Sequence, residues 1–182
     1  MLANAKLLTI FKAMPGLSND YIEKLMFKLS INPQKFKGVK PCDIFLKEVK
    51  NKINIFEEGD CFIINMSSSN NAGSHFISIF VSSPNKVDYF DSFGLPSFDS
   101  NINAAFQAAK LKVTEFDKAI QDISSQFCGL YCIAYLIWRQ IGLEKQNFAR
   151  LFNYNCKVLN DGIVLNLLKI YIKEKRTLYK AE

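Results

Sequence analysis

Residues 75–94 read HFISIFVSSPNKVDYFDSFG, and this stretch decides the fold. Two β-prone runs, 76–81 and 86–90, flank the turn sequence SSPN, a pattern typical of an antiparallel hairpin. His75 begins the first run and Asp91 follows the second. Because antiparallel pairing brings the start of one strand beside the end of the next, we expect these two side chains to be neighbours.

Further elements extend outward from this hairpin. Strands are expected at 61–66 and 112–116, and a loop at 32–43, which contains two prolines and a glycine. Helices are expected at 2–14, at 18–29 with Ser18 or Asn19 as cap, and at 43–49, 102–109, 128–140, 147–153 and 162–175. Strands in the middle of the chain with helices before and after them predict one α+β domain spanning 1–182. Its small central mixed or antiparallel sheet is flanked by helices.

Length and charge exclude several classes of protein. The chain has 182 residues, 49% of them hydrophobic, and a formal net charge of +6, so weak attraction to polyanions such as DNA is expected.

The longest apolar run, 130–138, is about half the length that spans a bilayer, and it predicts a buried helix and no membrane anchor. Five cysteines form an odd set and no secretory signal precedes them. We therefore expect free thiols, a reducing compartment and no secretion.

His75 is the single histidine of the chain, so any histidine-dependent chemistry must use it. It follows Gly73 and Ser74 at a loop-to-strand junction, where an imidazole can face a cleft. Asp91 would accept a hydrogen bond from one ring nitrogen and fix the tautomer. The same aspartate could also cap the turn that follows it at 92–94.

Cys128 precedes Gly129 at the start of the helix expected at 128–140. The unpaired N–H groups and the positive end of a helix stabilise a thiolate there, and the glycine leaves the sulfur open to substrate. The backbone N–H of Cys128 is one candidate donor to a tetrahedral oxyanion. A side-chain amide would supply the second donor. Gln121 and Gln126, seven and two residues before Cys128, both qualify.

Cys128 and Cys132 lie four residues apart and so on one helix face, which raises a metal-binding alternative. Zinc would need two further ligands, from a chain with one histidine and three scattered cysteines. We therefore expect no metal and no cofactor, and we expect Cys132 to lie in the core.

The order of these motifs resembles the adenovirus-type endopeptidases, or adenains. The motifs are GSHF at 73–76, YFDSFG at 89–94, and CGLYC at 128–132 preceded by Gln121 and Ser124. The related SUMO and ubiquitin-like proteases share the order histidine, aspartate, glutamine, cysteine.

The resemblance covers roughly 61–141 and implies a role for each matching residue. His75 would be the general base, Asp91 the orienting acid, Gln121 the oxyanion donor and Cys128 the nucleophile. The resemblance also implies an adenain-like cysteine protease fold.

The activity implied by the resemblance is a cysteine endopeptidase that matures viral or virus-like structural proteins. Capsid or core precursors would be its substrates, DNA and a short activating peptide its partners, and a monomer its state. Its location would be the host nucleus or cytoplasm and the virion. Phe76 stands where adenains commonly have tryptophan and Asp91 where adenovirus enzymes often have glutamate, which loosens the tie to true adenoviruses. Two alternatives are a SUMO or ubiquitin-like-protein isopeptidase and an inactive basic module that binds nucleic acid or capsid protein.

Overall fold

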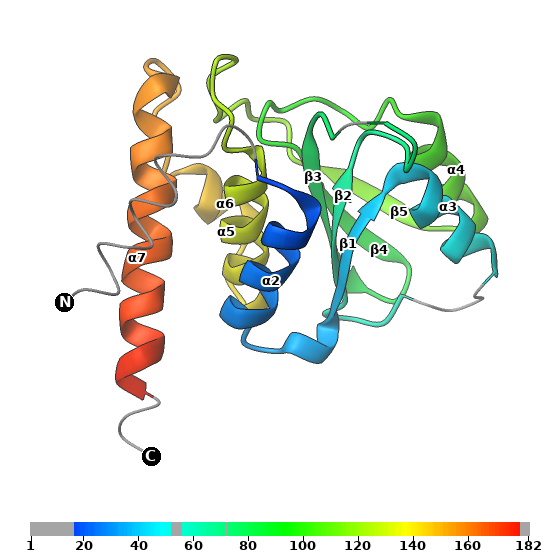
Figure 1. Cartoon of the computed structure of the whole chain (residues 1–182), viewed down its shortest axis with the longest axis horizontal. Coiled ribbons are helices and arrows are strands. Elements are labelled where there is room, and N and C mark those ends of the chain that lie inside the picture. The colour runs from blue at the N-terminus through cyan, green and yellow to red at the C-terminus, as the bar shows by residue number, and fades with distance from the viewer. Residues whose placement is uncertain (1–16, 52–55, 72, 179–182) are drawn as a thin grey trace.

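A five-stranded mixed sheet forms the centre of the protein, as a computed structural model shows (Figure 1). The structure describes residues 17–51, 56–71 and 73–178. The strands lie side by side in sequence order: β1 (Phe36–Pro41), β2 (Cys61–Asn65), β3 (Phe76–Ser83), β4 (Lys86–Phe90) and β5 (Lys112–Glu115). The β2–β3 and β3–β4 pairs are antiparallel, whereas β1–β2 and β4–β5 are parallel. The expected α+β class and central mixed sheet are confirmed.

Helices cover both faces of this sheet (Figure 1). Their bounds are α2 (Asn19–Leu29), α3 (Cys42–Asn51), α4 (Ser100–Ala108), α5 (Cys128–Gln140), α6 (Lys145–Ala149) and α7 (Asn160–Leu178). Two short 3-10 helices, η1 (Pro33–Lys35) and η2 (Lys157–Leu159), precede β1 and α7. One hydrophobic core lies between the sheet and α2, α5 and α6, and α7 packs on its outer side. A second core lies between the opposite face and α3 and α4.

The hairpin predicted from the sequence is present. In the β3–β4 pair, Ser78 lies opposite Phe90 and Ile79 opposite Tyr89, so the chain entering β3 lies beside the chain leaving β4. The strand expected at 86–90 has the bounds that the sequence predicts. This pairing brings residues 75 and 91 to one edge of the sheet.

The first described helix begins where its capping residue predicts. The Ser18 side chain accepts a hydrogen bond from the Tyr21 N–H at 3.3 Å, and α2 starts at the next residue. The helix expected at 2–14 lies outside the described residues. Toward the C-terminus, α6 begins two residues before the expected start at 147 and ends four residues before the expected end at 153. Helix α7 begins two residues before the expected start at 162.

The loop expected at 32–43 is wrong, because most of it forms η1 and the edge strand β1. Gly38 adopts a φ of +98°, and the register with β2 shifts between Phe36 and Val39. An edge strand tolerates such a bulge and a proline at its end, here Pro41. The glycine and prolines that indicate a loop therefore mark an irregular strand.

Helix α5 is the buried helix that its apolar sequence predicts, since residues 129–137 are all buried. Gly129 faces α2, where an added Cβ would lie 2.5 Å from Ile22 Cδ1. The glycine thus lets α5 pack closely on α2. None of the helices in the described part of the chain combines the length and apolar character that a bilayer crossing requires.

Candidate active site

His75 and Asp91 are hydrogen-bonded at the edge of the β3–β4 hairpin. His75 Nε2 lies 3.0 Å from Asp91 Oδ1, and the Asp91 side chain is almost fully buried. The His75 ring also stacks on Phe93, with centroids 4.8 Å apart. The neighbours that the hairpin predicts are therefore in contact, and the ring is held from two sides.

Asp91 also shapes the turn that follows it. Its Oδ1 accepts the Phe93 N–H at 2.7 Å, so one oxygen serves both the turn and the histidine. Gly94 has a φ of +68°, and a Cβ there would lie 2.4 Å from the Ala119 backbone nitrogen. Only glycine fits this position without strain, and the turn in turn fixes the Asp91 carboxylate.

Cys128 is the first residue of α5, so its backbone N–H has no partner within the helix. The N-cap residue Phe127 has an apolar side chain that cannot cap the first turn. The positive helix end therefore stays open to a negative group near Cys128.

Cys128 and Asp91 act on the same imidazole. Burial disfavours the charged ring, but side-chain hydrogen bonds with Asp91 and Cys128, together with their charges, raise the pKa of His75 to about 9. Because Nε2 faces Asp91, Nδ1 is the nitrogen left for the thiol. The arrangement favours a protonated imidazole beside Cys128 at neutral pH.

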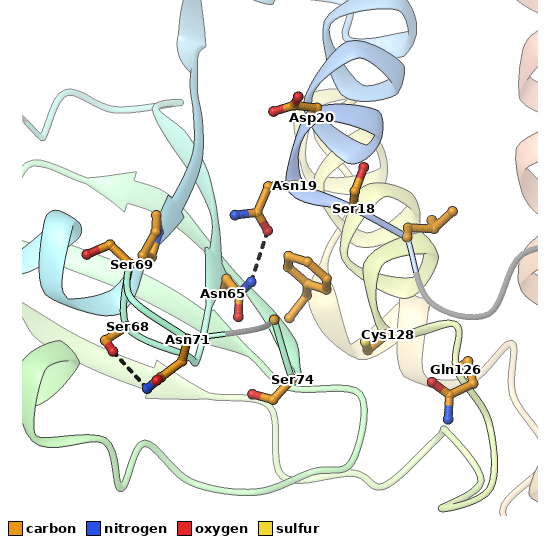
Figure 2. A pocket seen from close by; sticks show the side chains of 14 residues that line it. Ser18, Asn19, Asp20, Asn65, Ser68, Ser69, Asn71, Ser74, Gln126 and Cys128 are labelled. Atoms are coloured by element: carbon orange, nitrogen blue, oxygen red, sulfur yellow. Dashed lines mark hydrogen bonds between the residues drawn. The ribbon is translucent and has the colours of Figure 1, made fainter.

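A pocket of about 550 Å³ opens beside Cys128. Figure 2 shows Cys128 and Gln126 at its α5 end, and Asn65 hydrogen-bonded to Asn19 farther along it. Asp20 is the one charged residue among the described residues that line it. Most of the lining is neutral and polar: Ser18, Asn19, Asn65, Ser68, Ser69, Asn71, Ser74 and Gln126. Such a lining offers many hydrogen-bond donors and acceptors to a bound molecule.

The two candidate amide donors lie in different surroundings. Gln121 is buried, and its Nε2 donates to the Ser125 carbonyl at 3.0 Å and to Ser125 Oγ at 3.2 Å. Its Oε1 accepts from Ser92 Oγ at 2.5 Å. Gln126 instead lines the pocket with Cys128. The structure brings His75, Asp91 and Cys128 together, and engages the Gln121 amide within the loop before the cysteine.

The remaining cysteines differ from Cys128 in exposure or surroundings. Cys132 is fully buried and its Sγ donates to the Phe76 carbonyl, so it lies in the core as expected. Burial raises the pKa of Cys61 to about 12, and burial also raises the pKa of Cys42 and Cys132. Within the described residues, no three His, Cys, Asp or Glu side chains converge closely enough to hold a metal ion.

Two residues around this site were not among the predicted site residues. Phe93 stacks on the histidine, and Asp161 of α7 accepts a hydrogen bond from Ser125. The Phe-Gly pair after Asp91 indicates a turn but not a stacking partner. Nothing in the spacing of Asp161 indicates a contact with a loop 36 residues earlier.

No family model matches the sequence, and no curated protein matches it. Among solved structures, a deletion variant of AvrA with IP6 and CoA is 19% identical with a TM-score of 0.49. The alignment covers 78% of this chain and 53% of that one, so the chain spans about half the length of AvrA. A de-sumoylating protease is 15% identical with a TM-score of 0.46, covering 91% of this chain and 85% of the other. The central domain of an uncharacterized protein from Legionella pneumophila is 13% identical with a TM-score of 0.38, covering 80% and 88%.

Proposed function

We propose that this chain is a cysteine protease with Cys128 as nucleophile, His75 as general base and acid, and Asp91 as the group that orients the histidine. One observation carries the proposal: a single imidazole is hydrogen-bonded to a buried carboxylate, and that carboxylate and the thiol at the start of α5 together raise the pKa of the ring. This set of residues is the one that thiol hydrolases need.

The reaction follows from these positions. The Cys128 thiolate attacks the substrate carbonyl, and a tetrahedral oxyanion forms. The imidazolium of His75 gives its proton to the leaving amine as the C–N bond breaks, which leaves a thioester on Cys128 and a neutral ring. The neutral ring then takes a proton from water, which attacks the thioester. The acid product leaves and the thiolate–imidazolium pair returns.

The oxyanion needs hydrogen-bond donors on the pocket side of Cys128. In this proposal the backbone N–H of Cys128 is one donor, and the Gln126 amide is the side-chain candidate because Gln126 lines the same pocket. Gln121, the donor implied by the resemblance to adenains, acts in this proposal through its hydrogen bonds to Ser125.

The proposed substrates are polypeptides bound in extended form along the polar pocket. The order of histidine, aspartate, glutamine and cysteine resembles the adenains, so structural precursors of a viral or virus-like particle are the class to test first, with cleavage next to glycine. Stimulation by DNA or by a short activating peptide stays a prediction from the net charge and from that resemblance.

The test is proteolysis by the wild-type chain and by a Cys128→Ala variant. Both are incubated with a peptide library that contains glycine-rich sites and with a SUMO fusion, and new termini are mapped by mass spectrometry. We expect cleavage by the wild type alone. Equal cleavage by both proteins would overturn the proposal, and cleavage of the SUMO fusion alone would assign an isopeptidase in place of an endopeptidase.

A further inference from the structure

One carboxylate oxygen of α7 accepts hydrogen bonds from a residue before Cys128 and from a residue after it. Asp161 Oδ1 accepts a hydrogen bond from Ser125 Oγ at 2.9 Å and another from Tyr131 OH at 3.0 Å. Ser125 lies three residues before Cys128 and Tyr131 three residues after it. The loop leading to Cys128 and the first turn of α5 are thus joined through a single atom.

The Ser125 hydroxyl has its direction set by this contact. A carboxylate oxygen only accepts, so the hydroxyl proton points to Asp161 and the Ser125 oxygen is left as an acceptor. That oxygen accepts the Phe127 N–H at 3.2 Å and the Gln121 amide at 3.2 Å. The backbone immediately before Cys128 is therefore held by a chain of hydrogen bonds that begins at Asp161.

The start of α7 is itself fixed to the rest of the protein. Asn160 is fully buried, and its Nδ2 donates to the Ile120 carbonyl at 2.7 Å and to the Asn153 carbonyl at 2.8 Å. Its Oδ1 accepts the Asn153 N–H at 2.8 Å. Asp161 thus projects from an anchored helix start, which is what a support for a neighbouring loop requires.

We propose that Asp161 is a positioning residue for Cys128, acting through Ser125 and Tyr131 to hold residues 126–128 in the register that acyl transfer needs. The inference rests on the proposed function for its role in catalysis. Asp161 acts on the backbone around Cys128 and not on the His75–Asp91 hydrogen bond, so its loss should displace the oxyanion donors more than it changes the reactivity of the thiol. A displacement near 1 Å in such a site lowers the rate by roughly 100-fold.

The experiment separates these two effects in a Cys156→Ser background, which removes an exposed thiol. Acylation is followed as the burst of 4-nitrophenolate when the Cys128 thiolate attacks 4-nitrophenyl acetate and becomes an S-acetyl thioester. Thiolate reactivity is followed as labelling of Cys128 by iodoacetamide, which needs no oxyanion donor. Melting temperatures report whether each variant folds.

The variants are Ser125→Ala, Asp161→Ala and Tyr131→Phe, with Asp161→Asn as the conservative change that keeps an acceptor oxygen. We expect the first two to acylate about 10- to 100-fold more slowly while labelling stays within about twofold. Tyr131→Phe loses one hydroxyl only and keeps the ring, so it tests the inference if a larger change prevents folding. We expect Asp161→Asn to stay within about fivefold of the wild-type rate.

Ser124→Ala is the matched control, because the Ser124 hydroxyl donates to Asp122 and not to Asp161. We expect wild-type acylation from it. Unchanged acylation in folded Ser125→Ala, or equal losses of acylation and labelling, would overturn the inference. If the wild type shows an acylation burst that decreases in the variants but cleaves no peptide, the inference stands and the proposed protease activity is rejected. If the wild type shows no burst, both are overturned.

Discussion

His75 Nε2 lies 3.0 Å from Asp91 Oδ1, although 16 residues separate the two along the chain. The β3–β4 hairpin produces this contact, because it aligns the start of one strand with the end of the next. Stacking on Phe93 then restricts the imidazole to the orientation that the hydrogen bond requires.

The titration of His75 tests this arrangement directly, because the chain has no other histidine. Its pKa is raised to about 9, so NMR should show the ring protonated throughout the neutral range in the wild type. Asp91→Asn and Cys128→Ala each remove a group that raises the pKa of His75, so each should lower the midpoint. A midpoint near 6.5 in the wild type would contradict the contacts described.

The stability of the fold should decrease as the pH rises from neutral to alkaline. The pKa of His75 is higher in the folded chain than the ordinary value of 6.5, so the folded state binds its proton more tightly. This contribution is fully present below about pH 6.5 and is lost as the pH rises through about 9. Urea unfolding across this window should show wild type losing about 2 to 3 kcal/mol more than His75→Gln. Parallel curves for the two proteins would count against the raised pKa.

Alkylation should distinguish Cys128 from the buried thiols. Burial raises the pKa of Cys61 to about 12 and also raises the pKa of Cys42 and Cys132, so none of these forms a thiolate readily at pH 7. In the Cys156→Ser background, iodoacetamide should label Cys128 first, as read by peptide mass spectrometry. His75→Gln removes the imidazolium partner, so labelling should slow by roughly 10-fold. Equal labelling rates in the wild type and in His75→Gln would show that His75 does not activate Cys128.

The sequence predicts those parts of the site that depend on residues close together in the chain. The hairpin between 76–81 and 86–90 follows from two short β-prone runs around a turn, and it alone places His75 beside Asp91. The start of α5 at Cys128 is equally local, because the apolar stretch that follows it predicts the helix.

Contacts between segments that are distant in the sequence cannot be predicted from local patterns. Strand β1 was missed because Gly38 and Pro41 indicate a loop, and only pairing with β2 makes them strand residues. The contact of Asp161 with Ser125 depends on how α7 packs against α5, which no spacing encodes. From the residues alone, Gln121 and Gln126 stayed equal candidates, because the difference between them is which side chain faces the pocket.

Two single substitutions, Gln126→Ala and Gln121→Ala, should show which glutamine amide donates to the proposed oxyanion. Gln126 lines the pocket with Cys128, so Gln126→Ala should lower kcat by roughly 100-fold while iodoacetamide labelling of Cys128 is unchanged. Gln121→Ala removes a buried amide whose bonds run to Ser92 and Ser125, so it should lower the melting temperature as well as kcat. A large loss of kcat in Gln121→Ala with an unchanged melting temperature, and none in Gln126→Ala, would make Gln121 the donor.

The close packing of α5 on α2 can be tested at Gly129, where two effects oppose each other. Alanine favours a helix over glycine by about 1 kcal/mol, which alone would stabilise α5. An added Cβ would lie 2.5 Å from Ile22 Cδ1 in a packed core, and such overpacking costs about 1 to 3 kcal/mol. We therefore expect Gly129→Ala to destabilise the fold, measured by urea unfolding. Gly162→Ala, in the first turn of α7 with no atom of the described residues within 4 Å of its added Cβ, should be neutral or stabilising.

The same pair of helices offers a rescue. Ile22→Val removes the Cδ1 atom that the new Cβ would meet, at its own cost of about 0.5 to 1.5 kcal/mol. If the Ile22 contact is the cause, the double variant should lose less stability than the sum of the two single variants, because each change accommodates the other. Additive losses would place the cost of Gly129→Ala elsewhere, for example at Leu17 Cδ1, which lies 3.7 Å from the added Cβ. A non-additive result would show that the contact with Ile22 is what requires a glycine after Cys128.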